Sequence, residues 1–172
     1  MADTNKDLRE LSDKEAAQLE ALRAELDSRG VMYQILVHEN NLASAEDGAQ
    51  SGLGALDEMA PTFILRSKAG YFTAVVRGDT RLSYKKIKQH YGLKDISLTS
   101  PEEVEQLTGA KIGYVSLINP GMRTIVDERL LEKKIIYGGT GAANHTLQIH
   151  PQAVVEITGA EVFDFSEPKQ AS

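Results

Sequence analysis

Hydrophobic and polar residues alternate with two different periods in the first part of the chain. Leu19, Leu22 and Leu26 are spaced three and four residues apart, which places them on one face of a helix and predicts an amphipathic helix over about 13–29. The apolar run over residues 31–38 is rich in the β-favouring residues of a strand. The chain is therefore expected to open with a helix that buries a leucine face, followed by a strand.

Residues that favour helix ends predict four shorter helices. The clearest is the stretch SPEEVEQLTG, residues 100–109. Ser100 suits the N-cap, Pro101 suits the first helical position, and Glu103 is placed to return the capping hydrogen bond. The other three short helices are predicted after Ser44, after Ser83 and from Pro151.

Runs of β-favouring residues predict a sheet in the rest of the chain. Two such runs within residues 62–76 are separated by a short polar turn and predict a hairpin. Because strands and helices follow no strict βαβ rhythm, we expect a mixed α/β fold with a curled, barrel-like sheet and helices packed outside it. Further strands are predicted at YVSLI (114–118), TIVD (124–127), KIIYGG (134–139), TLQIH (146–150) and EVFDF (161–165).

The length of 172 residues suits a single hydrophobic core. We expect one domain over 13–166, a flexible N-terminal tail over 1–12 and a C-terminal tail over 167–172. The opening residues contain no apolar leader, and no later run approaches the roughly 20 apolar residues of a membrane span. We therefore expect a soluble cytoplasmic protein without a membrane partner.

Composition and charge remove several kinds of chemistry. Cysteine is absent, which excludes disulfides, thiolate nucleophiles and cysteine-based zinc sites. The 25 acidic and 19 basic side chains give a net charge of -6, which argues against DNA or long nucleic acids as partners. Local binding of the end of a nucleic acid is still compatible with this charge. The basic stretch over 81–92 either contacts nucleic-acid phosphates or forms the solvated face of a helix.

The glycine-rich stretch YGGTGAANHTLQIHP, residues 137–151, suggests a backbone that comes close to another group. It is not a Walker phosphate loop, because no Lys follows Gly141. It also departs from the dinucleotide fingerprint, since Asn144 replaces the third glycine and a strand, rather than a helix, is predicted next. The plainest alternative is a hairpin loop whose glycines permit positive φ.

The histidines near this stretch do not predict a metal site. His145 and His150 are five residues apart on a predicted strand, so their side chains leave opposite faces and cannot share an ion. The chain also lacks the Gly-x-Ser-x-Gly motif of a serine nucleophile. We therefore expect no metal, no cofactor and, for any hydrolysis, water as the nucleophile.

The order of several motifs resembles that of the YbaK and prolyl-tRNA synthetase associated domain. They are His38 after the first predicted strand, then APTFILRSKAGYFTAVVRGDTRLSYKKIKQHYG, LTSPEEVEQLTG, GYVSLINPG, TIVDERLLE and YGGTGAANHTLQIHPQAVVEITGA, within about residues 22–164. The resemblance implies a metal-independent hydrolase that removes a small wrong amino acid, such as Ala, Cys or Ser, from tRNA in trans. The implied partners are the aminoacylated 3′ end of tRNA and an aminoacyl-tRNA synthetase.

The resemblance also implies roles for individual residues. In the family, a Gly-x-x-x-Pro loop offers backbone N–H groups to the ester carbonyl; residues 113–117 correspond to it, with Leu117 in place of the proline. His145 matches a position where some relatives place a His near the substrate's amino group. Gly113 is equally typical of a turn. A His at the start of a strand, taken alone, is more often packed or at the surface than catalytic. The implied catalytic residues are Gly113 and His145, and the implied substrate contacts are Pro61, Thr62, Tyr114, Ser116, Gly138, Gly139, Thr140 and Gly141.

One departure from the family pattern leaves two functions open. Pro61 stands where many relatives carry a Lys that contacts the tRNA end or orients the ester, and proline has neither a charge nor an N–H. The first expected function is a trans-editing aminoacyl-tRNA deacylase. The alternative is a non-catalytic binder of aminoacyl-tRNA or nucleotide ends.

Overall fold

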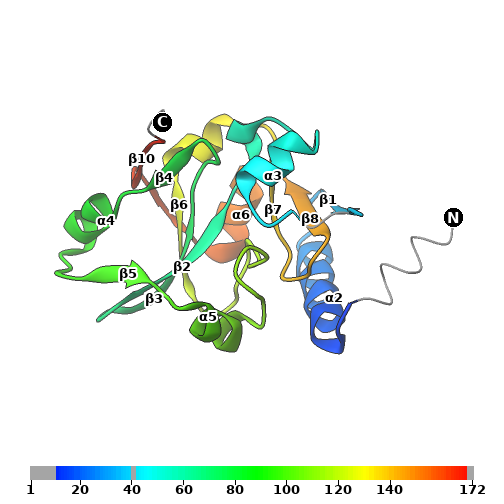
Figure 1. Ribbon diagram of the computed structural model, residues 1–172, viewed down its shortest axis with the longest axis horizontal. Coiled ribbons are helices and arrows are strands. Elements are labelled where there is room, and N and C mark those ends of the chain that lie inside the picture. The colour runs from blue at the N-terminus through cyan, green and yellow to red at the C-terminus, as the bar shows by residue number, and fades with distance from the viewer. Residues whose placement is uncertain (1–10, 40–41, 170–172) are drawn as a thin grey trace, which may run out of the picture.

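The computed structural model describes residues 11–39 and 42–169. Most of the tail expected over 1–12 lies outside these residues. In chain order the elements are α2 (Asp13–Ser28), β1 (Tyr33–Val37), α3 (Ala45–Gln50), η1 (Leu56–Glu58), β2 (Thr62–Ser67), β3 (Gly70–Val75), β4 (Thr80–Leu82), α4 (Tyr84–Tyr91), β5 (Ile96–Leu98), α5 (Pro101–Thr108), β6 (Arg123–Asp127), η2 (Glu128–Glu132), β7 (Ile136–Gly139), β8 (His145–Ile149), α6 (Pro151–Thr158), β9 (Glu161–Phe163) and β10 (Ser166–Pro168) (Figure 1).

The strands form three sheets in the described part of the chain. The largest has the order β5-β2-β3-β6-β9, the second β1-β8-β7, and the smallest pairs β10 with β4. β3 runs parallel to β6, and β6 runs parallel to β9, whereas the other neighbours are antiparallel. The mixed α/β fold is confirmed. The expected barrel-like curling is not, because none of the three sheets closes on itself.

The helices bury apolar faces against the sheets. Leu22 and Leu26 of α2 belong to one cluster with Leu147 and Ile149 of β8, as the predicted leucine face requires. Ile87 of α4 packs in a second cluster on the five-stranded sheet. In Figure 1, α2 and the β1-β8-β7 sheet lie on one side of the molecule and α4 lies at the opposite side.

Local capping signals predicted the helices well, with one difference in α5. Ser100 caps this helix by accepting a hydrogen bond from the Glu103 N–H at 3.3 Å. The Glu103 carboxylate, however, accepts a hydrogen bond from the Tyr71 hydroxyl and lies 3.6 Å from Arg66, so it does not return the capping bond. A long-range partner on the neighbouring hairpin therefore replaces the predicted local one.

The strand predicted over 114–118 is wrong. Only Ser116 makes a bridge there, to Gly139, and the Ile118 N–H donates to the Ser116 hydroxyl rather than to a strand. At the C-terminus, β10 reaches Pro168, two residues beyond the domain boundary expected at 166. Residues 167 and 168 thus pair with β4 instead of starting a tail.

A cluster of charged side chains holds the C-terminal strand in place. The Asp127 carboxylate is fully buried and accepts hydrogen bonds from the N–H of Phe165 at 3.0 Å and of Arg129 at 3.0 Å. Asp164 in turn accepts hydrogen bonds from Arg129 at 2.7 Å and Lys86 at 3.0 Å. These bonds tie α4 and η2 to the segment that leads into β10.

The Asp164 cluster predicts a pH-dependent stability. The hydrogen bond from Arg129, with help from Lys86, lowers the pKa of Asp164 from 3.8 to about 2. A lowered native pKa means that this stabilisation is complete above about pH 4 and is lost as the pH falls through 2. Asp164→Asn should therefore lower the free energy of unfolding at pH 7, by less than about 2 kcal/mol since the carboxylate is partly exposed and screened.

Urea denaturation of the wild type and Asp164→Asn at several pH values between 7 and 2 measures this effect. The difference between the two proteins should shrink towards pH 2. Asp95→Asn, at an exposed loop carboxylate, is the matched control and should show a smaller difference. A gap between wild type and Asp164→Asn that stays constant down to pH 2 would contradict the assignment.

Candidate functional site

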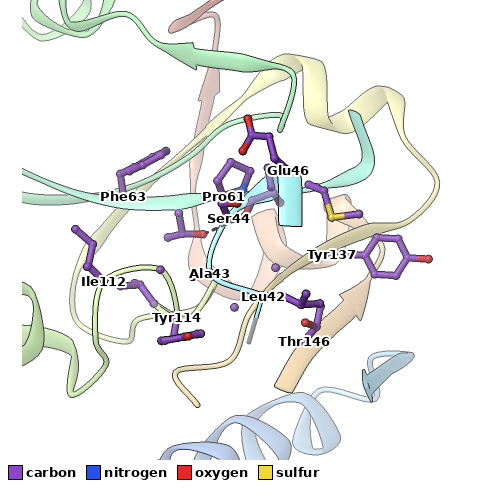
Figure 2. Close-up of a pocket in the computed structure, with 18 of the residues that line it drawn as sticks. Leu42, Ala43, Ser44, Glu46, Pro61, Phe63, Ile112, Tyr114, Tyr137 and Thr146 are labelled. Atoms are coloured by element: carbon purple, nitrogen blue, oxygen red, sulfur yellow. Dashed lines mark hydrogen bonds between the residues drawn. The ribbon is translucent and has the colours of Figure 1, made fainter. Parts of the chain in front are cut away.

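A cleft of about 660 Å³ opens between the large sheet and the β1-β8-β7 sheet. Figure 2 shows Phe63, Ile112 and Tyr114 towards one end of it, and Tyr137 and Thr146 towards the other. Its volume is in the usual range for small-molecule sites. The lining comes from residues 42–46, 59–63, 80–82, 112–115, 137–139 and 144–146, together with His38, Leu53, Tyr84, Leu98 and Lys169.

The edge of β7 that does not pair with β8 is held by two segments from different parts of the chain. Near the start of the strand the Ala60 N–H donates to the Tyr137 carbonyl at 2.8 Å. Two residues further on, the Leu117 N–H donates to the Gly139 carbonyl at 3.1 Å. These bonds bring the loop over 113–117, the glycine-rich strand and β8 to the same cleft.

The glycines of β7 are required by the approach of the 113–117 loop. A Cβ on Gly139 would lie 2.1 Å from the Val115 carbonyl oxygen, and one on Gly138 would lie 2.5 Å from the Leu117 side chain. The close contact that these glycines permit is therefore between two parts of the protein. Their backbones still line the cleft.

This contact predicts a large stability loss for Gly139→Ala. Gly139 does not have positive φ, so alanine introduces no backbone strain there, and the loss would come from the clash with the Val115 carbonyl. We expect about 2–3 kcal/mol of destabilisation in urea denaturation. At Gly121 a Cβ meets open space but φ is 84°, so Gly121→Ala should cost only about 1 kcal/mol. Equal losses for the two variants would contradict the packing argument.

Helix α2 supports the glycine-rich loop from behind. The Glu15 carboxylate accepts a hydrogen bond from the Ala143 N–H at 2.7 Å, and Gln18 lies where a side chain on Gly141 would be. Burial would raise the pKa of Glu15, but the N–H groups of Ala143 and Ser12 together hold it below its usual value. The ionised carboxylate thus anchors the loop that precedes His145.

His145 is buried and its ring orientation is fixed. Its Nδ1 lies 2.8 Å from the Ala143 carbonyl oxygen, which can only accept, so Nδ1 carries the hydrogen. In the neutral ring, Nε2 then carries the lone pair. Nε2 makes no hydrogen bond within residues 11–39 and 42–169, and it is not among their fully buried unpaired atoms. His145 therefore offers a free acceptor at the cleft.

Asn144, next to His145, has two unusual features. Its φ of 63° is the only positive φ of a non-glycine residue in the described part of the chain. Its side-chain oxygen is buried there without a hydrogen-bond donor. Such departures gather at binding sites, where a ligand can supply the missing partner.

His38 lies on the neighbouring strand end and also lines the cleft. Its Nε2 is 2.9 Å from the Thr146 hydroxyl, and its backbone N–H donates to the Asn144 carbonyl at 2.8 Å. Burial lowers the pKa of His38, and the nearby His145 adds to this effect. His38 thus braces β8 beside the cleft.

The loop over 113–117 presents an unused donor. The Tyr114 N–H donates to the Lys111 carbonyl and the Leu117 N–H to Gly139, whereas the Gly113 N–H has no partner among the described residues. Gly113 is exposed at the cleft with a φ of 93°, a conformation that favours glycine. A backbone donor there is available to a ligand.

The structure brings most, but not all, of the predicted site residues together. Ser116 and Thr140 line a second, smaller cavity of about 140 Å³ on the α2 side, and Gly141 is buried against Gln18. The residues that line the main cleft are Pro61, Thr62, Gly113, Tyr114, Gly138, Gly139 and His145.

Because Pro61 brings no charge to the cleft, a cation that contacts a ligand there has to come from another position. Arg77 pairs with Asp79 at 2.6 Å, and neither it nor Arg66, Lys68 or Arg123 is part of the lining. The lining cations are Arg81 and Lys169. Arg81 belongs to the basic stretch over 81–92, but nothing in the sequence linked Lys169 to the site.

Two further kinds of site find no support in the described residues. Within residues 11–39 and 42–169, no three His, Cys, Asp or Glu side chains are grouped so that they could hold a metal ion. No helix in the same ranges is long and apolar enough to cross a bilayer.

The molecule is thus a mixed α/β domain with a cleft walled by a glycine-rich strand, an unpaired backbone donor and a histidine. Residues 39–157 match the sequence model of the aminoacyl-tRNA editing domain. The chain belongs to this family, which confirms the resemblance found in its motifs.

The curated relatives are longer enzymes, and this chain matches one segment of each. The chain is 30% identical to the proline–tRNA ligase of Moorella thermoacetica over 115 residues, which is 61% of this chain and 20% of the ligase. It is 27% identical to the Thermotoga neapolitana proline–tRNA ligase over 97 residues, 55% of this chain and 17% of that one. The chain spans about a fifth of the length of these relatives.

Solved structures show the same fold. The crystal structure of the hypothetical protein APE2540 has a TM-score of 0.79 at 31% identity and covers 85% of this chain and 99% of its own. A protein described as a candidate trans-editing enzyme for prolyl-tRNA synthetase has a TM-score of 0.75 at 23% identity, covering 87% and 97%. At 23% identity, the similarity to this second structure shows a shared fold and no more.

Proposed function

We propose that this protein hydrolyses the ester between a small, wrongly attached amino acid and the 3′ end of a tRNA, acting in trans. The proposal is carried by one observation: the unpaired Gly113 N–H and the free acceptor of His145 line the same cleft. The cleft, at about 660 Å³, has room for an amino acid esterified to an adenosine. Family membership supports the substrate class.

This activity requires a hydrolytic site that is separate from the amino-acid pocket of the synthetase. A synthetase pocket rejects an amino acid that is smaller by a methylene by only about 1–3 kcal/mol, so errors must be removed after attachment. The synthetase partner and the cytoplasmic location expected from the sequence remain part of the proposal.

The chemistry follows from the two groups. Water attacks the ester carbonyl, and the Gly113 N–H donates to the oxygen on which negative charge develops. The tetrahedral intermediate then breaks its bond to the ribose oxygen, the proton that the attacking water gives up is transferred to that oxygen, and the free amino acid and the tRNA leave.

His145 positions the substrate in this scheme. Its Nε2 accepts a hydrogen bond from the ammonium group of the aminoacyl moiety and thereby holds the ester carbonyl towards Gly113. Pro61, Thr62 and Tyr114 contribute the neighbouring wall.

A panel of small aminoacyl-tRNAs, each incubated with protein well below the substrate concentration, tests the proposal. Repeated turnover on at least one member is the expected result. Saturable binding without release of amino acid from any member would favour the alternative, a non-catalytic binder, for which the uncharged Pro61 at the cleft is the specific observation.

A further inference from the structure

The small β4–β10 sheet forms one edge of the cleft. Arg81 and Leu82 of β4 line the cleft, and so does Lys169, the residue that follows β10. β10 and Lys169 lie beyond residues 39–157, the part that matches the editing domain. This edge is therefore built partly from chain outside the family match.

The two cations of the cleft lining lie at the same edge. Arg81 and Lys169 are the arginine and the lysine of the lining, and each is paired with a carboxylate, Glu167 and Glu46 respectively. Both pairs are partly exposed, so an anionic group that enters the cleft can bind the donors that the carboxylates leave free.

The Lys169 ammonium is held at this edge. It donates to the Gly78 carbonyl at 2.7 Å and to the Glu46 carboxylate, and the hydrogen bond from Lys169 lowers the pKa of Glu46. An ammonium has three donors, and these two contacts leave one of them for a ligand. The side chain is 38% exposed, so a ligand can reach it.

Arg81 is held beside it in a similar way. Its Nε lies 3.0 Å from the Glu167 carboxylate directly across the β4–β10 pair. The β10 segment is in turn anchored through Asp164. Both cations are therefore carried by the β4–β10 pair and the residue that follows it, which these contacts hold in place.

We propose that Lys169, with Arg81, binds a backbone phosphate of the tRNA 3′ end while the aminoacyl group occupies the part of the cleft next to His145. This inference rests on the proposed function, because it assigns the polynucleotide part of the same substrate to the β4–β10 edge. Lys169 acts here as a binding residue and takes no part in the chemical step.

The test compares two substrates for the wild type and Lys169→Gln. One is a full aminoacyl-tRNA, and the other is the same amino acid esterified to adenosine, which has no phosphate. For Lys169→Gln we expect a KM for aminoacyl-tRNA about 5- to 10-fold higher, kcat within about twofold, and unchanged kinetics on the adenosine ester. The slope of log KM against log salt should fall by about 0.7 to 0.9, the loss of one phosphate contact.

Two variants separate this role from a structural one. Lys94→Gln, at an exposed lysine away from the cleft lining, should leave both substrates unaffected. Lys169→Arg keeps a cation at this position, so it should keep KM for aminoacyl-tRNA within about twofold of the wild type. An equal loss on both substrates with Lys169→Gln, or the same loss with Lys169→Arg, would overturn the proposal, as would an unchanged KM of Lys169→Gln for aminoacyl-tRNA.

A failure of the proposed hydrolase activity can be distinguished from a failure of the proposed phosphate contact. If the wild type releases no amino acid from any aminoacyl-tRNA, the activity is wrong, and fluorescence anisotropy with deacylated tRNA then tests Lys169. Weaker binding and a smaller salt slope for Lys169→Gln would support the phosphate contact in a non-catalytic binder. Identical binding curves would overturn it.

Discussion

Replacing Gly113 by proline should reduce kcat for aminoacyl-tRNA hydrolysis by about 10²- to 10³-fold. The substitution removes the N–H that we assign to the developing oxyanion, and the loss of one such donor has this size in other acyl-transfer sites. Because the donor acts on charge that forms in the transition state, kcat should fall more than KM changes. Steady-state deacylation assays measure both.

Proline also disturbs the loop, since Gly113 has a φ of 93° and proline is fixed near -65°. Gly113→Ala is the first control: it strains the same φ and places a Cβ 3.0 Å from the Ala43 carbonyl, but it keeps the N–H. Its loss in kcat should be smaller than that of proline by at least tenfold. Replacing Gly113 by glycolic acid is the second control, because it removes only the N–H. Full activity of the glycolic acid variant would exclude the oxyanion role.

Replacing His145 by alanine should lower kcat/KM for aminoacyl-tRNA by roughly 10- to 100-fold. The expected size is that of a hydrogen bond to a charged group, here the ammonium of the aminoacyl moiety, about 1.5–3 kcal/mol. Discrimination between free and N-acetylated aminoacyl-tRNA is the sharper measurement. The wild type should prefer the free amine, and His145→Ala should hydrolyse both at a similar low rate.

His150→Ala is the matched control for this variant. His150 is exposed and caps α6 by accepting from the Gln152 N–H at 3.1 Å, so its loss should affect stability slightly and activity little. Circular dichroism should show that both variants are folded. If His145→Ala reduced hydrolysis of the free and the N-acetylated substrate by the same factor, the ammonium contact would be refuted.

Local signals explain why most helices could be predicted from the sequence and several strands could not. Ser44, Ser83 and Ser100 each accept a hydrogen bond from the N–H three residues later, a pattern visible in the sequence itself. β4, β5 and β10 contain three residues each, and they exist through pairing with distant segments. Three residues carry too little periodicity to reveal such partners.

The candidate site was predictable only where motif order identified it. Gly113 and His145 came from the family resemblance, and the structure places both at the cleft. Lys169 was missed because it lies about ninety residues from the glycine whose carbonyl it contacts. Asn144 belongs to the glycine-rich stretch, but its unpaired oxygen and positive φ depend on the folded environment.

The segments that brace the cleft have a practical consequence for work on this domain. α2 and β1 precede residues 39–157 and β10 follows them, so a fragment trimmed to the family match would retain the motifs and lose these braces. Without β1, the full length of β8 from His145 to Ile149 would become a bare edge, the kind of surface that recruits other chains into aggregates. Insolubility or inactivity of such a minimal fragment would then reflect its missing flanks rather than a defect in the editing motifs.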